Sequence, residues 1–342
     1  MNTQQGLTII NQDRRGLDMI GAAANHAAAQ SVLADYQARK AQETLRRQAA
    51  DIRLFETYLA QAGLLVSDMA SDLASWSGVT WGLVEGFIRW QLKEGYATGS
   101  INVHLATIKS YCELASKHGS LAPAAYSLVK TVKGYRASEG RNVDDSRKQV
   151  KLETRRPDAK KAEPVSISLE QARRLKSEQP ATKKGRRDAL LMCLLLDLGL
   201  RCGEISDLNV SSIDLQAGTL TFYRHKVHKW QTLNLERDAL LAARAYLADC
   251  NQGQDKPLFS GPCSGKRICE RTINARIGVL GKKIGLDNLS PHDCRHYWAT
   301  NAVRTGTDTK SLQDAGGWSS PAMPLMYAES SKIANSGVKL TV

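Results

Sequence analysis

Six side chains in the second half of the chain carry the chemistry that phosphoryl transfer without a metal ion requires: Arg201, Lys226, His292, Arg295, Trp318 and Tyr327. During in-line displacement a phosphodiester develops negative charge on its equatorial oxygens, and two fixed guanidinium groups can meet that charge with paired N–H donors. Arg201 and Arg295 suit this task. Tyr327 suits the attack on phosphorus, because a phenol that has lost its proton is a competent nucleophile.

Proton transfer accounts for two more of these residues. The leaving 5′ oxygen needs a proton, which a lysine on a hairpin, such as Lys226, can deliver. His292 fits the removal of the proton from a phenol, whose unperturbed pKa is about 10. His292 and Arg295 are three positions apart at the expected start of a helix, so they share one face of it.

Each of these residues also has an ordinary structural use when it is considered alone. Arg201 follows Gly199 and can be a surface cap of a helix, whereas Lys226 at a hairpin tip is usually solvated. A lone tyrosine such as Tyr327 more often packs than reacts. The order of the whole set along the chain, rather than any one member, favours a shared site.

Three stretches of sequence resemble the tyrosine site-specific recombinases, the family that includes the phage integrases, the Xer proteins and Cre. "GLRCGEISDL" looks like the first arginine box of that family, and "HKVHKWQTLNL" resembles its lysine hairpin. "HDCRHYWATNAVRTGTDTKSLQDAGGWSSPAMPLMY" is similar to the second box nearly throughout, with the tyrosine at the expected distance. The resemblance is strong over residues 165–330 and looser over 41–130.

The resemblance implies a role for each matching residue. Tyr327 would attack the scissile phosphate and form a 3′-phosphotyrosyl bond, and the stored bond energy would make ATP, metal ions and other cofactors unnecessary. Lys226 aligns with the family's lysine better than Lys229 does. Most members have His where this chain has Trp318, whose indole N–H can donate to a phosphate oxygen but cannot shuttle protons. Two further residues are expected just behind the catalytic groups: Glu204, which would orient the arginine and histidine, and His296.

The resemblance also implies a function and partners. The expected function is site-specific recombination in mobile-element integration, excision or resolution, by a homotetramer on two double-stranded DNA sites with accessory DNA-bending factors. Two alternatives are a catalytically silent DNA-binding regulator of the same fold and an enzyme similar to type IB topoisomerases. The filled catalytic positions speak against the first, and the helical first domain and the tail speak against the second.

The elements that must position these residues divide the chain into two domains. The fold is expected to be mainly α with a small β-hairpin, and the resemblance implies a two-domain, C-shaped clamp on DNA. Five segments are expected: a helical N-terminal extension (1–40), a helical, SAM-like core-binding domain (41–130), a basic linker (131–164), a mixed α/β catalytic domain (165–330) and a C-terminal tail (331–342). The length, 342 residues, also favours two domains.

Periodicity predicts the individual elements. Residues 21–63 are typical of one long helix or two in succession, and helices follow at 80–95 and 98–119. In the second half we expect a buried helix from Asp188 to Leu198 with Gly199 as its C-cap, and then a β-hairpin around the tip 225–229. Further helices are expected at 236–250 and 267–284.

Charge favours a polyanionic partner. The formal net charge is +13, which supports sequence-independent affinity for phosphate backbones, although a basic enzyme with no polymer partner has the same property. A basic linker can be solvated surface or can lie along a DNA backbone, and we favour the second. The predicted DNA contacts are Lys130, Lys133, Arg136, Arg147, Lys148, Lys151, Arg155, Arg156 and Lys229.

Location and the tail complete the expectations. The longest apolar run is far shorter than the roughly 20 residues of a membrane span, and no secretory signal opens the chain, so a cytoplasmic protein without membrane contact is expected. The tail carries three apolar residues in alternation, Val338, Leu340 and Val342. By the resemblance it docks on a neighbouring subunit, and the alternative is a frayed terminus.

Overall fold

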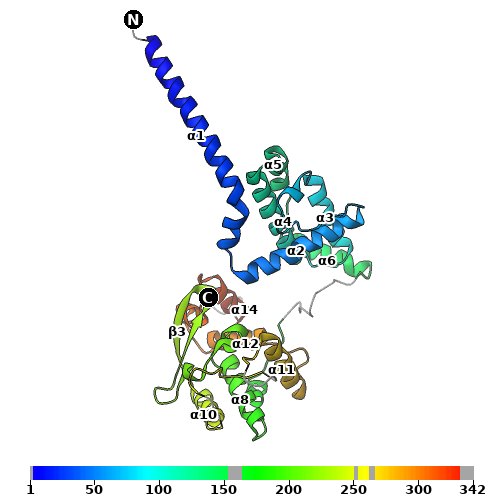
Figure 1. Ribbon diagram of the computed structural model, residues 1–342. Coiled ribbons are helices and arrows are strands. Elements are labelled where there is room, and N and C mark those ends of the chain that lie inside the picture. The colour runs from blue at the N-terminus through cyan, green and yellow to red at the C-terminus, as the bar shows by residue number, and fades with distance from the viewer. Residues whose placement is uncertain (1–2, 153–163, 250–252, 262–265, 332–342) are drawn as a thin grey trace, which may run out of the picture. The chain divides into compact units, whose positions relative to one another are not determined.

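The chain divides into two compact units, residues 1–160 and 161–342 (Figure 1). The structure, a computed structural model, describes residues 3–152, 164–249, 253–261 and 266–331. Helices dominate both units, and one three-stranded sheet lies in the second, which confirms the expected mainly helical fold. Among the described residues, no helix is both long and apolar enough to cross a membrane.

The first unit is helical throughout its described part. Its helices are α1 (Thr3–Ala38), α2 (Gln42–Gln61), α3 (Trp81–Lys93), α4 (Thr98–His118), α5 (Pro123–Thr131) and α6 (Ala137–Gln149). Of the two alternatives expected for residues 21–63, one long helix or two in succession, the structure has two. Stacked and edge-on aromatic rings form the centre of the core, where Phe55 contacts both Trp76 and Phe87 at centroid distances of 6.0 and 5.1 Å.

The segment predicted as a linker differs from expectation, because residues 137–149 form α6 and pack on the first unit. The N-terminus of α6 is capped, since Glu139 accepts a hydrogen bond from the backbone N–H of Arg136 at 2.7 Å. Arg147, near its end, is buried and donates Nη2 to the carbonyl of Leu92 at 2.8 Å. Few large apolar residues occur here, so the helix depends on its cap and on this polar contact with α3.

The second unit holds the remaining elements. They are α7 (Leu169–Ser177), α8 (Lys183–Leu196), α9 (Cys202–Asp207), β1 (Ile213–Asp214), β2 (Thr219–Arg224), β3 (Lys229–Asn234), α10 (Arg237–Leu247), α11 (Glu270–Lys283), α12 (Pro291–Arg304), α13 (Thr309–Gly316) and α14 (Ala322–Ser331). Helix α8 begins with the Thr182 side chain as its cap and ends two residues before the predicted Leu198. The cap at its end is Asp197 rather than Gly199.

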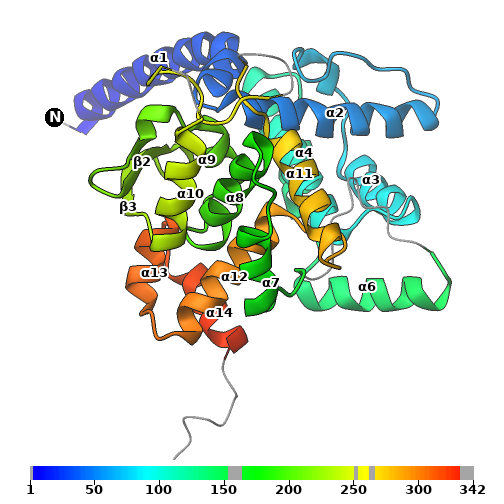
Figure 2. The same cartoon turned by 90° about the horizontal axis from the view of Figure 1, so that it is seen from below.

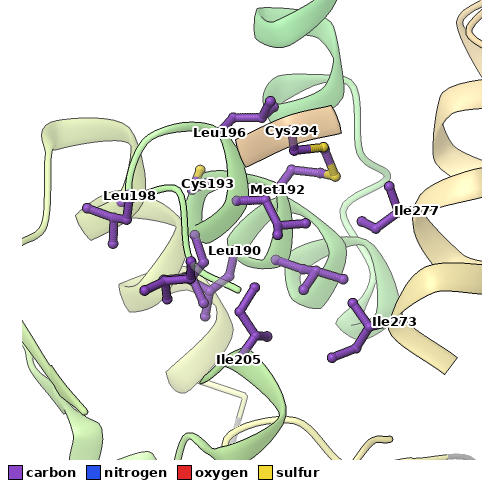
Figure 3. Packing of buried hydrophobic residues seen from close by; sticks show 14 of the residues in the cluster. Leu190, Met192, Cys193, Leu196, Leu198, Ile205, Ile273, Ile277 and Cys294 are labelled. Carbon is purple, nitrogen blue, oxygen red and sulfur yellow. The ribbon is translucent and has the colours of Figure 1, made fainter. Parts of the chain in front are cut away.

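Helix α8 is the centre of the second unit, and α7, α10 and α12 pack around it (Figure 2). Every residue from Leu190 to Leu196 is buried, as expected of a helix that is apolar on all sides. Its side chains meet Ile205 of α9, Ile273 and Ile277 of α11 and Cys294 of α12 in one hydrophobic cluster (Figure 3). Helix α9, which Arg201 caps, and helix α12, which carries His292 and Arg295, are therefore anchored to the same core.

The small sheet is antiparallel in the order β1-β2-β3, which confirms the predicted hairpin. Its tip is a short 3₁₀ helix, η4 (His225–Val227), and Arg224 pairs with Lys229 across the strands. Along β2 the buried positions alternate as Leu220, Phe222 and Arg224. The third inward position is thus an arginine, Arg224.

Candidate active site

Arg201 and Arg295 come together at the turn between α8 and α9. Arg201 is the N-terminal cap of α9, and Arg295 lies in the second turn of α12. Between the two lies Gly199, whose φ of +60° is a left-handed conformation and whose carbonyl accepts a hydrogen bond from Nη1 of Arg295. A Cβ at this position would also collide with the ring of Trp298, so only glycine fits.

Both guanidinium groups bind the C-terminal end of α13. Nη2 of Arg295 donates to the carbonyl of Gly316, and Nη2 of Arg201 donates to the carbonyl of Gly317 at 3.3 Å. Carbonyls at a helix C-terminus lack intrahelical donors and carry the negative end of the helix dipole, so they attract cations. The two arginines are therefore held side by side through consecutive carbonyl oxygens.

Glu204 joins Arg201 to a third arginine, Arg224. Oε1 of Glu204 accepts from Nη1 of Arg201 at 2.9 Å and from Nη1 of Arg224 at 2.8 Å. Its Oε2 accepts the backbone N–H of Arg201 at 2.8 Å. Glu204 thus holds Arg201 through both its backbone and its side chain, and the expected role of Glu204 toward the histidine stays a prediction. With three guanidinium groups and one buried carboxylate, the cluster carries excess positive charge and suits an anion.

Arg224 is the residue of this cluster that the sequence reasoning missed. It is 0% exposed, and burial lowers its pKa while Glu204 opposes that change. The signal that could have found it is the alternation in β2, which turns positions 220, 222 and 224 toward the interior. An arginine at such a position requires partners inside the protein.

Arg295 is a strongly desolvated cation. Burial, with the nearby charge of Arg201 as a second cause, lowers its pKa to about 9. A bound anion would replace the lost hydration and stabilise the charged form of the guanidinium. A perturbed cation beside other cations is a common property of functional sites.

Tyr327 lies next to this cluster, inside helix α14. The side chain is 1% exposed and packs in a small core with Ala299 and Leu312. Burial raises the pKa of its phenol, although Arg295 and Arg201 oppose the rise. The phenol is therefore protonated at neutral pH and needs a base before it can attack. Although Pro324 lies within it, this segment is helical, and the side chain of Tyr327 is buried.

Trp318 lies between the arginines and the tyrosine. Its ring centre is 4.6 Å from the guanidinium carbon of Arg295 and 5.8 Å from the ring centre of Tyr327. The turn before it is fixed by Gly317, whose φ of +59° ends α13 in a left-handed cap. The position holds the guanidinium by its π face.

The two histidines have different surroundings. His296 is half-buried, its ring centre is 5.0 Å from that of Tyr327, and burial lowers its pKa, with His292 as a second cause. His292 is exposed one turn earlier, at the start of α12. The structure therefore places His296, rather than His292, against the phenol.

The lysines stand on the hairpin. Lys226 is exposed in η4, two residues after Arg224, and Lys229 is exposed at the start of β3. The structure thus brings together Arg201, Arg295, Trp318, Tyr327, Glu204 and His296. The roles of Lys226 and His292 at a phosphate stay predictions.

The predicted DNA contacts of the first unit fall into three groups. Five side chains are exposed: Lys130, Lys133, Arg136, Lys148 and Lys151. Arg147 differs from the predicted exposed contact, because its guanidinium is buried and Nη2 donates to the carbonyl of Leu92 on α3. Arg155 and Arg156 lie outside the described residues. In the part of the chain that the structure describes, no cluster of His, Cys, Asp and Glu suits a metal ion.

Comparison with known proteins shows which family the second unit resembles. Residues 166–333 match the model of the phage integrase family. The chain is 26% identical over 279 residues to tyrosine recombinase XerA of Thermococcus kodakarensis, which covers 81% of this chain and 90% of that protein. It is 27% identical over 269 residues to tyrosine recombinase XerC of Actinobacillus pleuropneumoniae, which covers 77% and 79% of the two chains.

Solved structures share the fold at lower identity. The Tn1549 transposon integrase in complex with a circular intermediate DNA superimposes with a TM-score of 0.61 at 16% identity, covering 88% of this chain and 94% of that one. A lambda integrase dimer bound to a COC′ core site superimposes with a TM-score of 0.59 at 15% identity, covering 93% and 79%.

Proposed function

The chain belongs, through residues 166–333, to the phage integrase family of tyrosine recombinases, and we propose that it breaks and rejoins DNA at a specific site with Tyr327 as the nucleophile. One observation carries the proposal: Arg201 and Arg295 are fixed side by side next to a buried phenol, with Trp318 between them. Two guanidinium groups beside a tyrosine match the charge that develops at a phosphodiester under in-line attack.

The chemistry follows from this arrangement. The Tyr327 oxygen forms a bond to phosphorus while the bond from phosphorus to the 5′ oxygen breaks, which leaves a 3′-phosphotyrosyl link and a 5′-hydroxyl. The phenol gives up its proton to a histidine. The two candidates are His292 and His296, which lie one turn apart in α12. The 5′ oxygen takes a proton from Lys226. Arg201 and Arg295 exchange their peptide carbonyls for the equatorial phosphate oxygens.

The reaction needs no external energy source. The phosphotyrosyl bond keeps the energy of the broken phosphodiester, and the 5′-hydroxyl of a partner strand attacks it in the reverse sense. The proposal therefore includes independence of ATP and of metal ions. Because Tyr327 is buried in this structure, α14 has to shift before its hydroxyl reaches a phosphate.

The proposed substrate is double-stranded DNA. Exposed basic side chains of the first unit, such as Lys133 and Lys148, are proposed to contact the phosphate backbone, together with Lys229 on the hairpin. We further propose a homotetramer on two DNA sites, accessory DNA-bending factors, and a tail, residues 331–342, that docks on a neighbouring subunit. The reaction would serve mobile-element integration, excision or resolution in the cytoplasm.

A nicked suicide duplex tests this function. Duplexes that bind the protein are selected from a randomised library, and the selected sequence is rebuilt with a nick near its centre. After cleavage the short 5′-hydroxyl fragment diffuses away, so religation cannot occur. The proposal predicts a covalent protein–DNA adduct that survives denaturation. Sequence-specific binding without an adduct would favour a DNA-binding regulator, and supercoil relaxation without site preference would favour a topoisomerase.

A further inference from the structure

Arg224 makes an unusual set of contacts at the end of β2. Besides Glu204, its guanidinium donates Nη2 to the carbonyl of Ala315 at 2.6 Å and Nη1 to the carbonyl of Gly316 at 3.3 Å. Nε donates to Oε1 of Gln231 on the neighbouring strand. A fully buried cation is strongly destabilising without such partners, so the guanidinium is committed to this position.

Gln231 completes the arrangement from β3. Its Nε2 donates to the carbonyl of Asp314 at 2.8 Å. Together Arg224 and Gln231 therefore bind the carbonyls of three successive residues, 314 to 316, at the end of α13. These carbonyls lie where a helix lacks its own donors and where a positive charge is favourable. We call this pair of side chains the hairpin latch.

The hairpin latch lies directly under the turn that leads to Trp318. A Cβ built on Gly317 would lie 2.5 Å from Cδ and 2.7 Å from Nε of Arg224, so the arginine stem fills the space beside that glycine. Arg201 also binds this turn, through the carbonyl of Gly317. The arginine stem therefore packs against the turn that precedes Trp318, whose ring has its own contacts with Arg295 and Tyr327.

The other end of the latch is the hairpin tip. Arg224 is followed at once by η4, which holds Lys226, and β3 resumes at Lys229. A latch residue on each strand fixes both strands of the hairpin to α13. Movement of the tip relative to the Gly316–Trp318 turn therefore requires these hydrogen bonds to break.

We propose that Arg224 and Gln231 are positioning residues that couple the hairpin carrying Lys226 to the turn carrying Trp318. The inference rests on the proposed function, because it concerns when Lys226 reaches the leaving 5′ oxygen. Arg224 is fully buried and so touches neither DNA nor the phosphate. Its effect acts through the placement of Lys226, and loss of the latch slows proton delivery without weakening DNA binding.

A substrate with a different leaving group isolates this effect. In a suicide duplex whose 5′-bridging oxygen is replaced by sulfur, the leaving group departs as a thiolate, which needs no proton because thiols ionise at a pKa of about 8.5. A defect in Lys226 placement should vanish on this substrate. General damage to the arginines or to Tyr327 should persist.

The experiment compares Gln231→Leu and Arg224→Lys with the unaltered protein and with Thr232→Ala. Thr232 is the neighbouring β3 residue, and its hydroxyl bonds that of Thr221 at 2.9 Å, away from α13. Thermal melting first checks that each variant is folded. We expect Gln231→Leu to cleave the oxygen substrate about tenfold more slowly and the sulfur substrate at nearly the unaltered rate, with unchanged DNA affinity. Thr232→Ala should behave as the unaltered protein on both.

Two results would overturn the inference. Equal slowing of Gln231→Leu on the oxygen and sulfur substrates would mean that the latch does not act through Lys226, and normal rates on both would mean that it does not act at all. If the unaltered protein formed an adduct with neither the oxygen nor the sulfur substrate, the proposed function would be overturned, and the proposed role of the latch with it.

Discussion

The guanidinium carbon of Arg295 lies 4.6 Å from the centre of the Trp318 ring, and the same guanidinium donates to the carbonyl of Gly316, two residues before that tryptophan. Trp318 is thus held to Arg295 by its ring and by its backbone turn. Because the ring also contacts Tyr327, the arginine and the tyrosine share one support. The predictions below follow from this arrangement.

Replacing Trp318 tests whether its ring holds Arg295 and Tyr327 in place. Trp318→Ala removes the ring from both Arg295 and Tyr327, and we expect a loss of about 2 kcal/mol in the free energy of unfolding, because the ring is half-buried. Adduct formation should fall by more than tenfold. Trp318→His keeps a planar ring with an N–H donor and should retain most of the activity. Chemical denaturation and the suicide-duplex assay measure the two effects, and a fully active Trp318→Ala would contradict the assigned support.

Removing Glu204 should leave two guanidinium groups facing each other without their shared carboxylate. Glu204→Ala should lower the free energy of unfolding by about 3 kcal/mol, because removing one partner of a buried ion pair leaves uncompensated charge. Glu204→Gln retains the shape and one oxygen acceptor, so its loss should be smaller. Urea unfolding of both variants checks this order. Equal stability of Glu204→Ala and the unaltered protein would show that the cluster is not held by Glu204.

His296 gives a pH dependence with a definite sign. Its pKa is lowered from the ordinary value of 6.5, chiefly by burial. As pH falls below 6.5, the unfolded chain binds a proton that the folded protein takes up only at lower pH, so stability is lost as pH falls. His296→Gln should show a weaker loss between neutral and acidic pH. His104 in the first unit, whose pKa is also lowered by burial, contributes equally to both proteins. If the free energy of unfolding fell equally with pH in His296→Gln and in the unaltered protein, His296 would not be a cause of the pH dependence.

Two neighbours in α6 should behave in opposite ways. Arg147→Ala should lower the free energy of unfolding of the first unit by about 2 kcal/mol, because a buried charge-assisted hydrogen bond to Leu92 is lost. Lys148→Ala should leave stability unchanged, since its ion pair with Asp145 is exposed. If Lys148 binds a phosphate, that variant reduces the slope of DNA affinity against salt by about one. Melting curves and binding titrations at several salt concentrations distinguish them.

Sequence reasoning was most successful where a residue's chemistry restricts its use. Arg201, Arg295, Trp318 and Tyr327 were expected together, and the structure gathers them around one turn. Arg224 was missed because its role depends on α13, about ninety positions away in the chain, and local pattern shows only an inward-facing polar residue. The core on which Tyr327 packs could not be predicted for a similar reason, because Ala299 and Leu312 lie on other helices.

The predicted linker shows a different limit. Residues 137–149 have few apolar side chains, which is why we expected no helix there, yet a cap at Arg136 and the contact of Arg147 with α3 stabilise one. Hydrophobic periodicity cannot detect a helix that is held mainly by polar contacts. Arg147 makes this contact and is buried, so it is not one of the exposed charges. Sequence alone cannot distinguish a buried arginine from a solvated one.

The most direct test of the central claim locates the covalent bond itself. The suicide-duplex adduct is digested with nuclease and trypsin, and mass spectrometry identifies the peptide that carries the nucleotide. The tryptic peptide 311–332 contains one tyrosine, Tyr327. We predict a nucleotide joined through its 3′ phosphate to that residue, and no adduct in Tyr327→Phe, which should still bind the duplex. A nucleotide on any other residue, or an undiminished adduct in Tyr327→Phe, would contradict the account.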